Sequence, residues 1–296
     1  MKKTAVFWIR DGVFVDRMHV NPVAFAVAAL SHAEPKAITG TNLTELTNFA
    51  FATSGISCLD KIRRFNEERM QIVSEVSAAS HYYNKLASEA ASQCHYFDGA
   101  CGLVKELGKA GVLNFITSAV EQSVLDAWAL SPQGVQLVPH LTEVLGQRPG
   151  FNKGRDHFSY VREHYGVEEI FYIADAVAEI SNGAQLSQEL KIYPVGFAHV
   201  ITPAKVRLAH KLVLDAHARL SPVNSSTGAN ALAFNEAELS LPDAVTLCNM
   251  LKSAKATHVV VGDASDIIGN LSAYLQECGV LQKSKHFTSS TESPAH

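Results

Sequence analysis

The sequence has no uninterrupted apolar run long enough to span a bilayer, and the short apolar stretch after its first three residues turns polar too soon for a secretory signal. It has no run of Lys or Arg, and its formal net charge of -4 is mild, so we expect neither nucleic acid nor an anionic membrane as a partner. The five cysteines are scattered and form no Cys-x-x-Cys pair, which argues against a zinc knuckle and a disulfide framework. These absences predict a cytoplasmic globular protein.

Apolar runs typical of strands alternate along the chain with longer amphipathic stretches. This alternation predicts an α/β fold, a doubly wound parallel sheet flanked by helices. With 296 residues, the chain can bury a substantial core as one large domain or as a domain plus a smaller one. The runs expected as core strands are residues 4–9, 112–116, 136–139, 170–174, 193–197 and 258–261.

A long block with helical spacing and little strand character, residues 21–92, separates the first two expected strands. It predicts a helical domain inserted directly after the first strand. We therefore expect a helical insertion over residues 17–97, and a core built from residues 1–16 and 98–282.

The later part of the chain departs from simple alternation at residues 202–255. Here we expect a helix at 203–220, with a proline in its first turn, then a loop at 221–230 and a return to helix after Pro242. The tail, residues 283–296, is polar and rich in Ser and Thr, so we expect it to be disordered.

A buried strand runs into a glycine turn near the start of the chain, where residues 5–16 read AVFWIRDGVFVD. This stretch resembles the first motif of the haloacid dehalogenase (HAD) superfamily, a hydrophobic strand followed by Asp-x-Asp-Gly and Thr or Val. When the motif is aligned on Gly12 and Val13, its second aspartate is Asp11. Ile9 then stands where the family has the aspartate that attacks the substrate and binds the metal.

Three further stretches resemble the remaining HAD motifs, in the family's order. A strand that ends in Thr117 and Ser118 resembles the second motif, whose hydroxyl and neighbouring amides hold phosphate. Lys153, just before an expected helix, resembles the lysine of the third motif, which neutralises an anion. Asp175 after a strand, with Glu179 four residues on, resembles the acidic fourth motif that binds magnesium. No single motif is specific, but their order and spacing together are.

The resemblance implies a HAD-like, Rossmann-like core with an inserted α-helical cap, of the phosphoglycolate phosphatase-like type. It also implies that Asp11, Thr117, Lys153 and Asp175 converge at the carboxyl ends of the strands, where open α/β sheets bind ligands.

The substitution at position 9 removes the chemistry that the family uses. A covalent HAD phosphatase needs a carboxylate that attacks phosphorus and shares Mg²⁺ with a second acidic cluster, and Ile9 can do neither. Asp11 is then the expected acid/base, although it could equally serve only to brace the turn. Desolvation could raise its pKa, with Arg10 or Lys153 opposing the shift. Asp175 and Glu179 remain as metal ligands, so Mg²⁺ binding is possible but weakened.

We therefore expect a HAD-like protein that holds an anionic small molecule through Thr117, Ser118 and Lys153. It would catalyse a non-hydrolytic acid/base reaction or, as a pseudo-enzyme, none. One alternative is a Mg²⁺-dependent phosphatase or dehalogenase-type hydrolase, which would need another nucleophile. A second is a scaffold in which residues 202–255 form a homodimer contact or dock a partner protein. A long surface insertion without function fits this segment as well.

Overall fold

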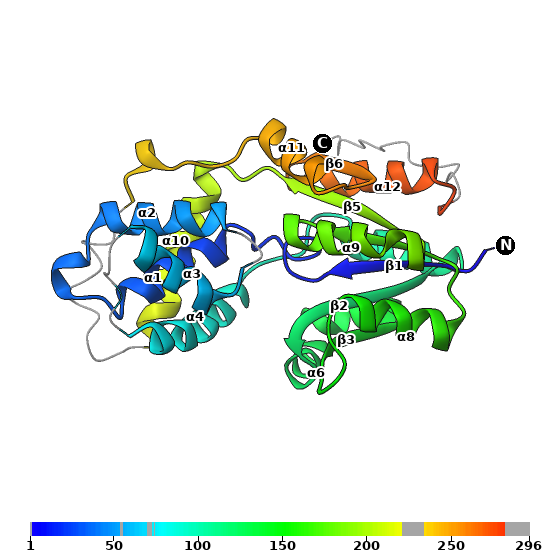
Figure 1. The fold of residues 1–296 in the computed structure, drawn as a ribbon, viewed down its shortest axis with the longest axis horizontal. Helices are drawn as coiled ribbons and strands as arrows, with labels where there is room; N and C mark the ends of the chain where they lie inside the picture. The colour runs from blue at the N-terminus through cyan, green and yellow to red at the C-terminus, as the bar shows by residue number, and fades with distance from the viewer. Residues whose placement is uncertain (1, 54–55, 70–72, 74, 221–233, 282–296) are drawn as a thin grey trace, which may run out of the picture.

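A sheet covered by helices and a separate bundle of helices make up the two lobes of the protein (Figure 1). The computed structural model describes residues 2–53, 56–69, 73, 75–220 and 234–281. The expected loop at 221–230 and the expected disordered tail at 283–296 lie outside these residues.

The described residues form one six-stranded sheet in the order β3-β2-β1-β4-β5-β6, with every neighbouring pair parallel. This confirms the α/β fold class. The strands are β1 (Thr4–Ile9), β2 (Leu113–Glu121), β3 (Glu143–Gln147), β4 (Glu169–Ala174), β5 (Ile192–His199) and β6 (His258–Gly262). A parallel sheet is covered on both faces, which is why its strands read as nearly continuous apolar runs.

The centre of the sheet lies at β1, whose residues Ala5 to Trp8 have no exposed surface. Phe7 stacks on Phe115 of β2, with ring centroids 5.2 Å apart, and meets the edge of Phe158 at 4.9 Å. Phe158 belongs to α8 (Arg155–Tyr165). These rings therefore join β1 and β2 to a helix on one face of the sheet.

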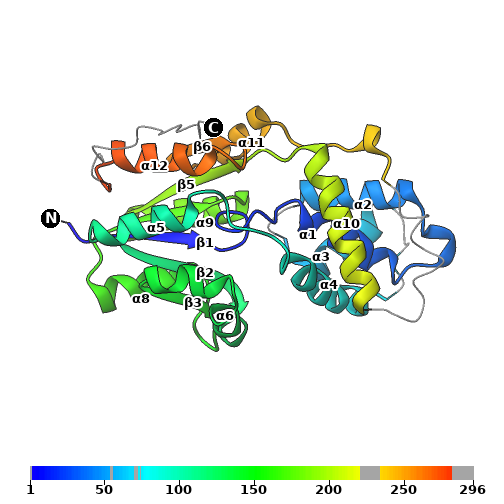
Figure 2. The same cartoon turned by 180° about the vertical axis from the view of Figure 1, so that it is seen from behind.

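Helices cover both faces of the sheet. On one face lie α8 and α9 (Val177–Leu190), and on the other lie α5 (Ala100–Lys109) and α12 (Ile267–Glu277), as Figures 1 and 2 show from opposite sides. The helix α6 (Gln122–Ala129) follows β2, and α11 (Ala244–Ser253) packs on the β5 and β6 side.

One expected strand is wrong. Residues 136–139 lie in the short helix α7 (Gly134–Leu137) and the 3-10 turn η2 (Val138–His140), and the edge strand is β3 instead. A four-residue apolar run does not distinguish helix from strand. Pairing with β2 decides the matter, since the amide of Thr142 donates to the carbonyl of Asn114 at 2.6 Å and brings the next residues into the sheet.

The second lobe is a helical cap, inserted between β1 and β2 as expected. It contains α1 (Val20–Leu30), the 3-10 turn η1 (Pro35–Ala37), α2 (Gly40–Ala52), α3 (Cys58–Glu68) and α4 (Val76–Ala91). In α1 every residue except Asn21 is buried, as befits a helix that is apolar on all sides and lies inside a bundle.

The helix expected at 203–220 is confirmed as α10 (Pro203–Leu220), but it does not cover the sheet. It packs against α1 and α4 of the cap, although it follows β5 in the chain. Figure 2 shows α10 lying across the cap helices. No helix in the described part of the chain is long and apolar enough to cross a membrane.

Candidate functional site

The candidate site begins where β1 ends and the chain turns toward the cap. Ile9 is the last residue of β1, is 7% exposed and lies opposite Thr117 of β2. The turn that follows is closed by amides of Phe14 and Val15, which both donate to the carbonyl of Arg10 at 3.1 Å. Position 9 therefore presents a buried apolar side chain at the carboxyl end of the central strand.

Asp11 is bound by two arginines. Arg10 donates from Nε to Oδ1 at 2.8 Å and from Nη2 to Oδ2 at 3.0 Å, and Nη1 of Arg17 lies 3.2 Å from Oδ1. Burial alone would raise the pKa of Asp11, but the two guanidinium groups outweigh it and lower this pKa to about 2. Arg10 thus opposes desolvation as expected, whereas no motif in the sequence pointed to Arg17.

Lys153 and Glu179, expected as the anion-binding lysine and a metal ligand, form an ion pair with each other. Lys153 stands in the turn before α8, and Glu179 lies in the first turn of α9. The Tyr172 hydroxyl also donates to Oε2 of Glu179, at 3.3 Å. An incoming anion would therefore have to share Lys153 with Glu179 or displace it.

Asp175 follows β4 and reaches toward the turn after β1. A Cβ atom built on Gly12 would lie 2.3 Å from its Oδ2, and Gly12 has φ of 93°, so glycine is needed there for both reasons. Burial and the charge of Glu179 raise the pKa of Asp175 to about 7. Lys153 and Asp11 also act on this carboxylate electrostatically, so these four charged residues share one edge of the sheet.

Thr117 does not join them through its hydroxyl group. The residue is fully buried, and its Oγ1 lies 2.8 Å from Nδ1 of His157, a buried residue of α8. The strand β2 also continues to Glu121 instead of ending at Thr117. Ser118 uses its Oγ to accept from the amide of Val120 at 3.2 Å. Both hydroxyl oxygens therefore already have a partner within the protein.

The donor set fits magnesium poorly. Ile9 offers no oxygen, both oxygens of Asp11 are held by Arg10, and Glu179 is paired with Lys153. Over the part of the chain that the structure describes, no group of three or more His, Cys, Asp or Glu side chains is arranged to hold a metal ion. We therefore derive no chemical step through magnesium, and weakened Mg²⁺ binding stays a prediction.

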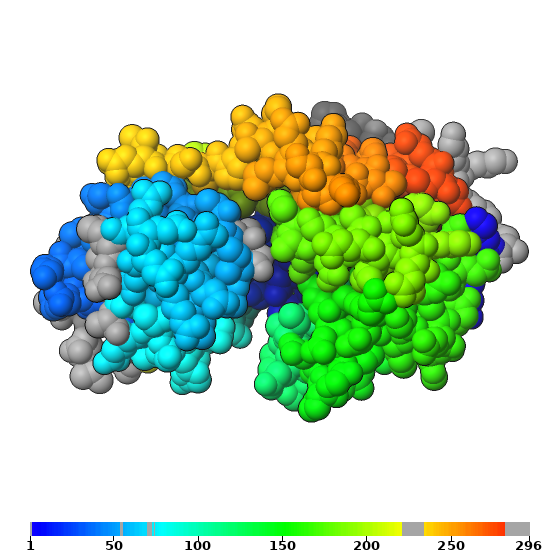
Figure 3. Space-filling view, viewed as in Figure 1, coloured from blue at the N-terminus to red at the C-terminus, as the bar shows by residue number. Residues whose placement is uncertain are grey.

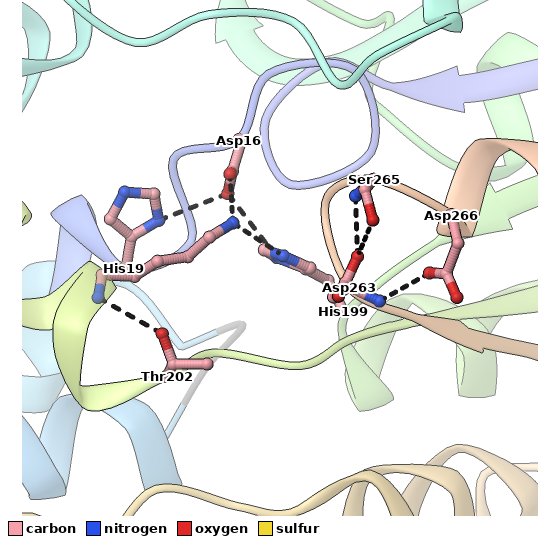
Figure 4. A network of polar contacts seen from close by, with 8 residues as sticks. Asp16, His19, His199, Thr202, Asp263, Ser265 and Asp266 are labelled. Carbon is pink, nitrogen blue, oxygen red and sulfur yellow. Dashed lines mark hydrogen bonds and ion pairs between the residues drawn. The ribbon is translucent and has the colours of Figure 1, made fainter. Parts of the chain in front are cut away.

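A second polar cluster lies where cap and core join, and the motifs gave no signal for it (Figure 4). Asp16 lies 3.3 Å from Nδ1 of His19 and 3.6 Å from Nδ1 of His199, and it forms an ion pair with Lys205. Nζ of Lys205 also lies 3.1 Å from Nε2 of His199. Burial opposes the shift, but His19 and Lys205 lower the pKa of Asp16 to about 2. A cavity of about 250 Å³ borders this cluster.

No protein-family model matches the sequence, and no curated protein matches it. The structure does resemble solved structures. A predicted phosphatase from Clostridium acetobutylicum superposes with a TM-score of 0.55 at 11% identity, over 94% of this chain and 99% of that chain. A HAD family hydrolase from Deinococcus radiodurans R1, solved with bound phosphate and sodium, gives 0.55 at 16% identity, over 95% and 98%.

A third solved structure shows the same likeness. A protein from Lactobacillus delbrueckii subsp. bulgaricus, provisionally named a phosphoglycolate phosphatase, gives a TM-score of 0.52 at 16% identity, over 96% of this chain and 100% of that chain. At sequence identities this low, a structural likeness shows the fold alone. The chain thus has the fold of HAD-like hydrolases, a parallel Rossmann-like sheet with helices inserted after its first strand.

Proposed function

We propose that this protein binds an anionic small molecule in the cleft between the sheet edge and the cap, and that it does not form an aspartyl intermediate. Ile9 is the observation that carries the proposal. Its side chain is buried at the end of β1 and has no oxygen that could attack phosphorus or bind a metal ion. Figure 3 shows the cleft between the two lobes, with the N-terminal part of the chain at its floor.

Cationic side chains at the sheet edge support an anionic ligand. Arg10, Arg17 and Lys153 lie close enough to Asp11 to lower its pKa, although Lys153 is also paired with Glu179 at the same edge. Arginine binds carboxylates and phosphates through paired hydrogen bonds, and lysine acts as a point charge. The Deinococcus radiodurans protein, which shares this fold, was solved with bound phosphate, which is consistent with an anionic ligand.

The ionised state of Asp11 favours binding over acid/base catalysis. A general acid or base works best when its pKa lies near the working pH, and the pKa of Asp11 is about 2. Its two oxygens are already held by Arg10. We therefore favour a pseudo-enzyme over a non-hydrolytic acid/base enzyme in which Asp11 acts.

A Mg²⁺-dependent hydrolase is the second candidate, because the solved proteins of this fold are named phosphatases or hydrolases. It would need a nucleophile other than residue 9. Purified protein incubated with generic phosphate esters and Mg²⁺ separates the two functions, since our proposal expects no turnover above the buffer rate.

Binding is tested directly by calorimetry and by a thermal-shift screen. Inorganic phosphate, phosphorylated metabolites and carboxylated metabolites are the probes, and we expect at least one class to raise the melting temperature. If none does, and a partner protein co-purifies through residues 202–255, the scaffold function replaces this one. We also propose a cytoplasmic location, which cell fractionation would test.

A further inference from the structure

The segment between β5 and β6 runs from the sheet to the cap and back. After β5 the chain enters α10, which packs on the cap, and it returns to the sheet at α11. Residues 234–241 cross α2 on the way back and include the 3-10 turn η4 (Glu236–Glu238). We call α10 together with residues 234–241 the strap.

The strap holds the cap along the whole length of α10. Val206, Ala209, Val213 and Ala216 recur every three or four residues, are fully buried and form the apolar face of the helix. Near its end, Nδ1 of the His217 ring and the Tyr82 hydroxyl oxygen of α4 are hydrogen-bonded at 2.6 Å. The buried face of α10 is thus already used within the chain.

The returning part of the strap is attached to α2. The amide of Asn235 donates to Oγ1 of Thr44 at 3.1 Å. Asn48 makes two hydrogen bonds, since its Nδ2 donates to the carbonyl of Glu238 at 2.8 Å and its Oδ1 accepts from the amide of Ser240 at 2.9 Å. These bonds join side chains of the cap to the backbone of the strap, so they depend little on which residues the strap carries.

The segments that connect the two lobes are bonded to each other or to the sheet. The amide of Asp16 donates to the carbonyl of His95 at 3.0 Å, and the amide of Phe97 donates to the carbonyl of Phe14 at 2.9 Å. The amide of Val200 donates to Gly262 of β6 at 3.0 Å. A cap that swung freely on the core would break these bonds.

Lys205 joins these segments at one point. It lies in the first turn of α10, yet it pairs with Asp16 of the β1–α1 connection and contacts His199 at the end of β5. Its side chain is 23% exposed and that of Asp16 is 18% exposed, so the pair is largely shielded from water. Shielded pairs are costly to break when one partner is removed, because the remaining charge is left without compensation.

We propose that the strap fixes the angle between cap and core, and that the pair Lys205–Asp16 is its latch. A cap inserted after β1 has two connections to the core, and its rotation about them strains only the hydrogen bonds between them. The strap adds two more, at residues 200–202 and at 239–243, and rotation would have to stretch them. The ligand cleft is then preformed, and entry of the ligand requires no rotation of the cap. This goes beyond the proposed function and holds whatever the ligand is.

Hydrogen exchange of the full-length protein, followed by mass spectrometry without ligand, tests the proposal. We expect amides of residues 10–19, 93–99 and 199–202 to be protected in the wild type. Lys205→Met should speed their exchange by roughly tenfold or more, while α1 inside the cap keeps its protection. Lys211→Met is the matched control, since Lys211 is an exposed lysine of the same helix, and Lys205→Arg should keep the charge and the protection.

The wild-type measurement alone can overturn the proposal. Fast exchange of residues 10–19, 93–99 and 199–202, together with slow exchange inside both lobes, would mean that the cap swings freely. Exchange in Lys205→Met that matches Lys211→Met would show that the strap needs no latch. If Lys205→Met does not fold, Asp16→Asn, which removes the other charge of the pair, replaces it in the same comparison.

Discussion

The guanidinium group of Arg10 binds both carboxylate oxygens of its neighbour Asp11, at 2.8 and 3.0 Å. Bidentate pairs of this kind are among the stronger hydrogen-bonded contacts in proteins. Arg10 also lies over the ring of Trp128, 5.4 Å from its centroid, which fixes the guanidinium group further. The carboxylate that the HAD resemblance offers as acid/base is therefore held as an anion by the guanidinium groups of Arg10 and Arg17.

The substitution Ile9→Asp tests whether the absence of a carboxylate at position 9 prevents hydrolysis. We expect the wild type to show no Mg²⁺-dependent hydrolysis of generic phosphate esters, because no carboxylate occupies position 9. The variant restores a carboxylate at the end of β1, so any gain in turnover above the wild type must arise from it. Initial rates with and without Mg²⁺ measure the effect.

Asp11→Asn is the companion variant in the same assay. Its turnover should equal that of the wild type. Robust wild-type turnover that Asp11→Asn abolishes would instead identify Asp11 as the nucleophile and contradict the proposed function.

Lys153 is expected to contribute to anion binding, and Glu179 to compete with the ligand for it. Lys153→Ala should weaken the binding of an anion by about 1.5 to 3 kcal/mol, the range for a charge-assisted hydrogen bond. Glu179→Gln should strengthen it, because Lys153 then loses its carboxylate partner. Calorimetry with the best anion from the thermal-shift screen measures both changes. A Lys153→Ala protein that binds the anion as tightly as the wild type would exclude Lys153 from the site.

Gly12 is expected to be indispensable for the turn. Gly12→Ala should destabilise the protein by about 1 to 3 kcal/mol, because the new Cβ would meet Asp175 and because φ of 93° strains any side chain. Gly102→Ala is the control, since Gly102 is exposed in the first turn of α5 and nothing lies within 4 Å of its added Cβ, and it should stabilise by up to about 1 kcal/mol. Urea denaturation measures both. A Gly12→Ala protein as stable as the wild type would mean that the turn is not packed in this way.

The buried His157 is expected to make stability fall in acid. Burial lowers the pKa of His157 to about 4, whereas an unfolded histidine titrates near 6.5. Between these values the unfolded chain binds the extra proton. The contribution of the neutral ring is therefore complete above about pH 6.5 and is lost as the pH falls toward 4. We expect the free energy of unfolding to drop by about 1 to 3 kcal/mol from this group between pH 7 and 4.5.

Urea denaturation at several pH values in this range gives the slope of the unfolding free energy against pH, which checks the effect. His157→Gln removes the titrating ring, so its stability should depend less steeply on pH, even if it is lower at pH 7. His81→Gln changes an exposed histidine and should keep the wild-type slope. A His157→Gln slope identical to that of the wild type would show that the ring titrates normally. Asp11 and Asp16, whose pKa values are lowered to about 2, add their own loss only below about pH 4.

Local patterns in the sequence determined much of the fold. The bounds of β1 and α10 agree with the expected ones, because β1 is a continuous apolar run with polar residues on both sides and α10 has helical spacing and begins at a proline. The order of four short motifs indicated the HAD-like sheet and the cap inserted after β1. The absence of a carboxylate at position 9 is likewise a fact of the sequence alone, and the chemistry that it removes follows from the side chain of isoleucine.

Only the tertiary structure decided which partners the site residues have. The Lys153–Glu179 pair, the contact of Thr117 with His157 and the approach of Arg17 to Asp11 each join elements distant in the chain or turned toward each other by a loop. The packing of α10 on the cap is of the same kind, because an amphipathic helix shows that it has a buried face but not which surface covers it. Periodicity along the chain determines the elements, whereas the choice among several possible partners depends on the positions of all of them in space.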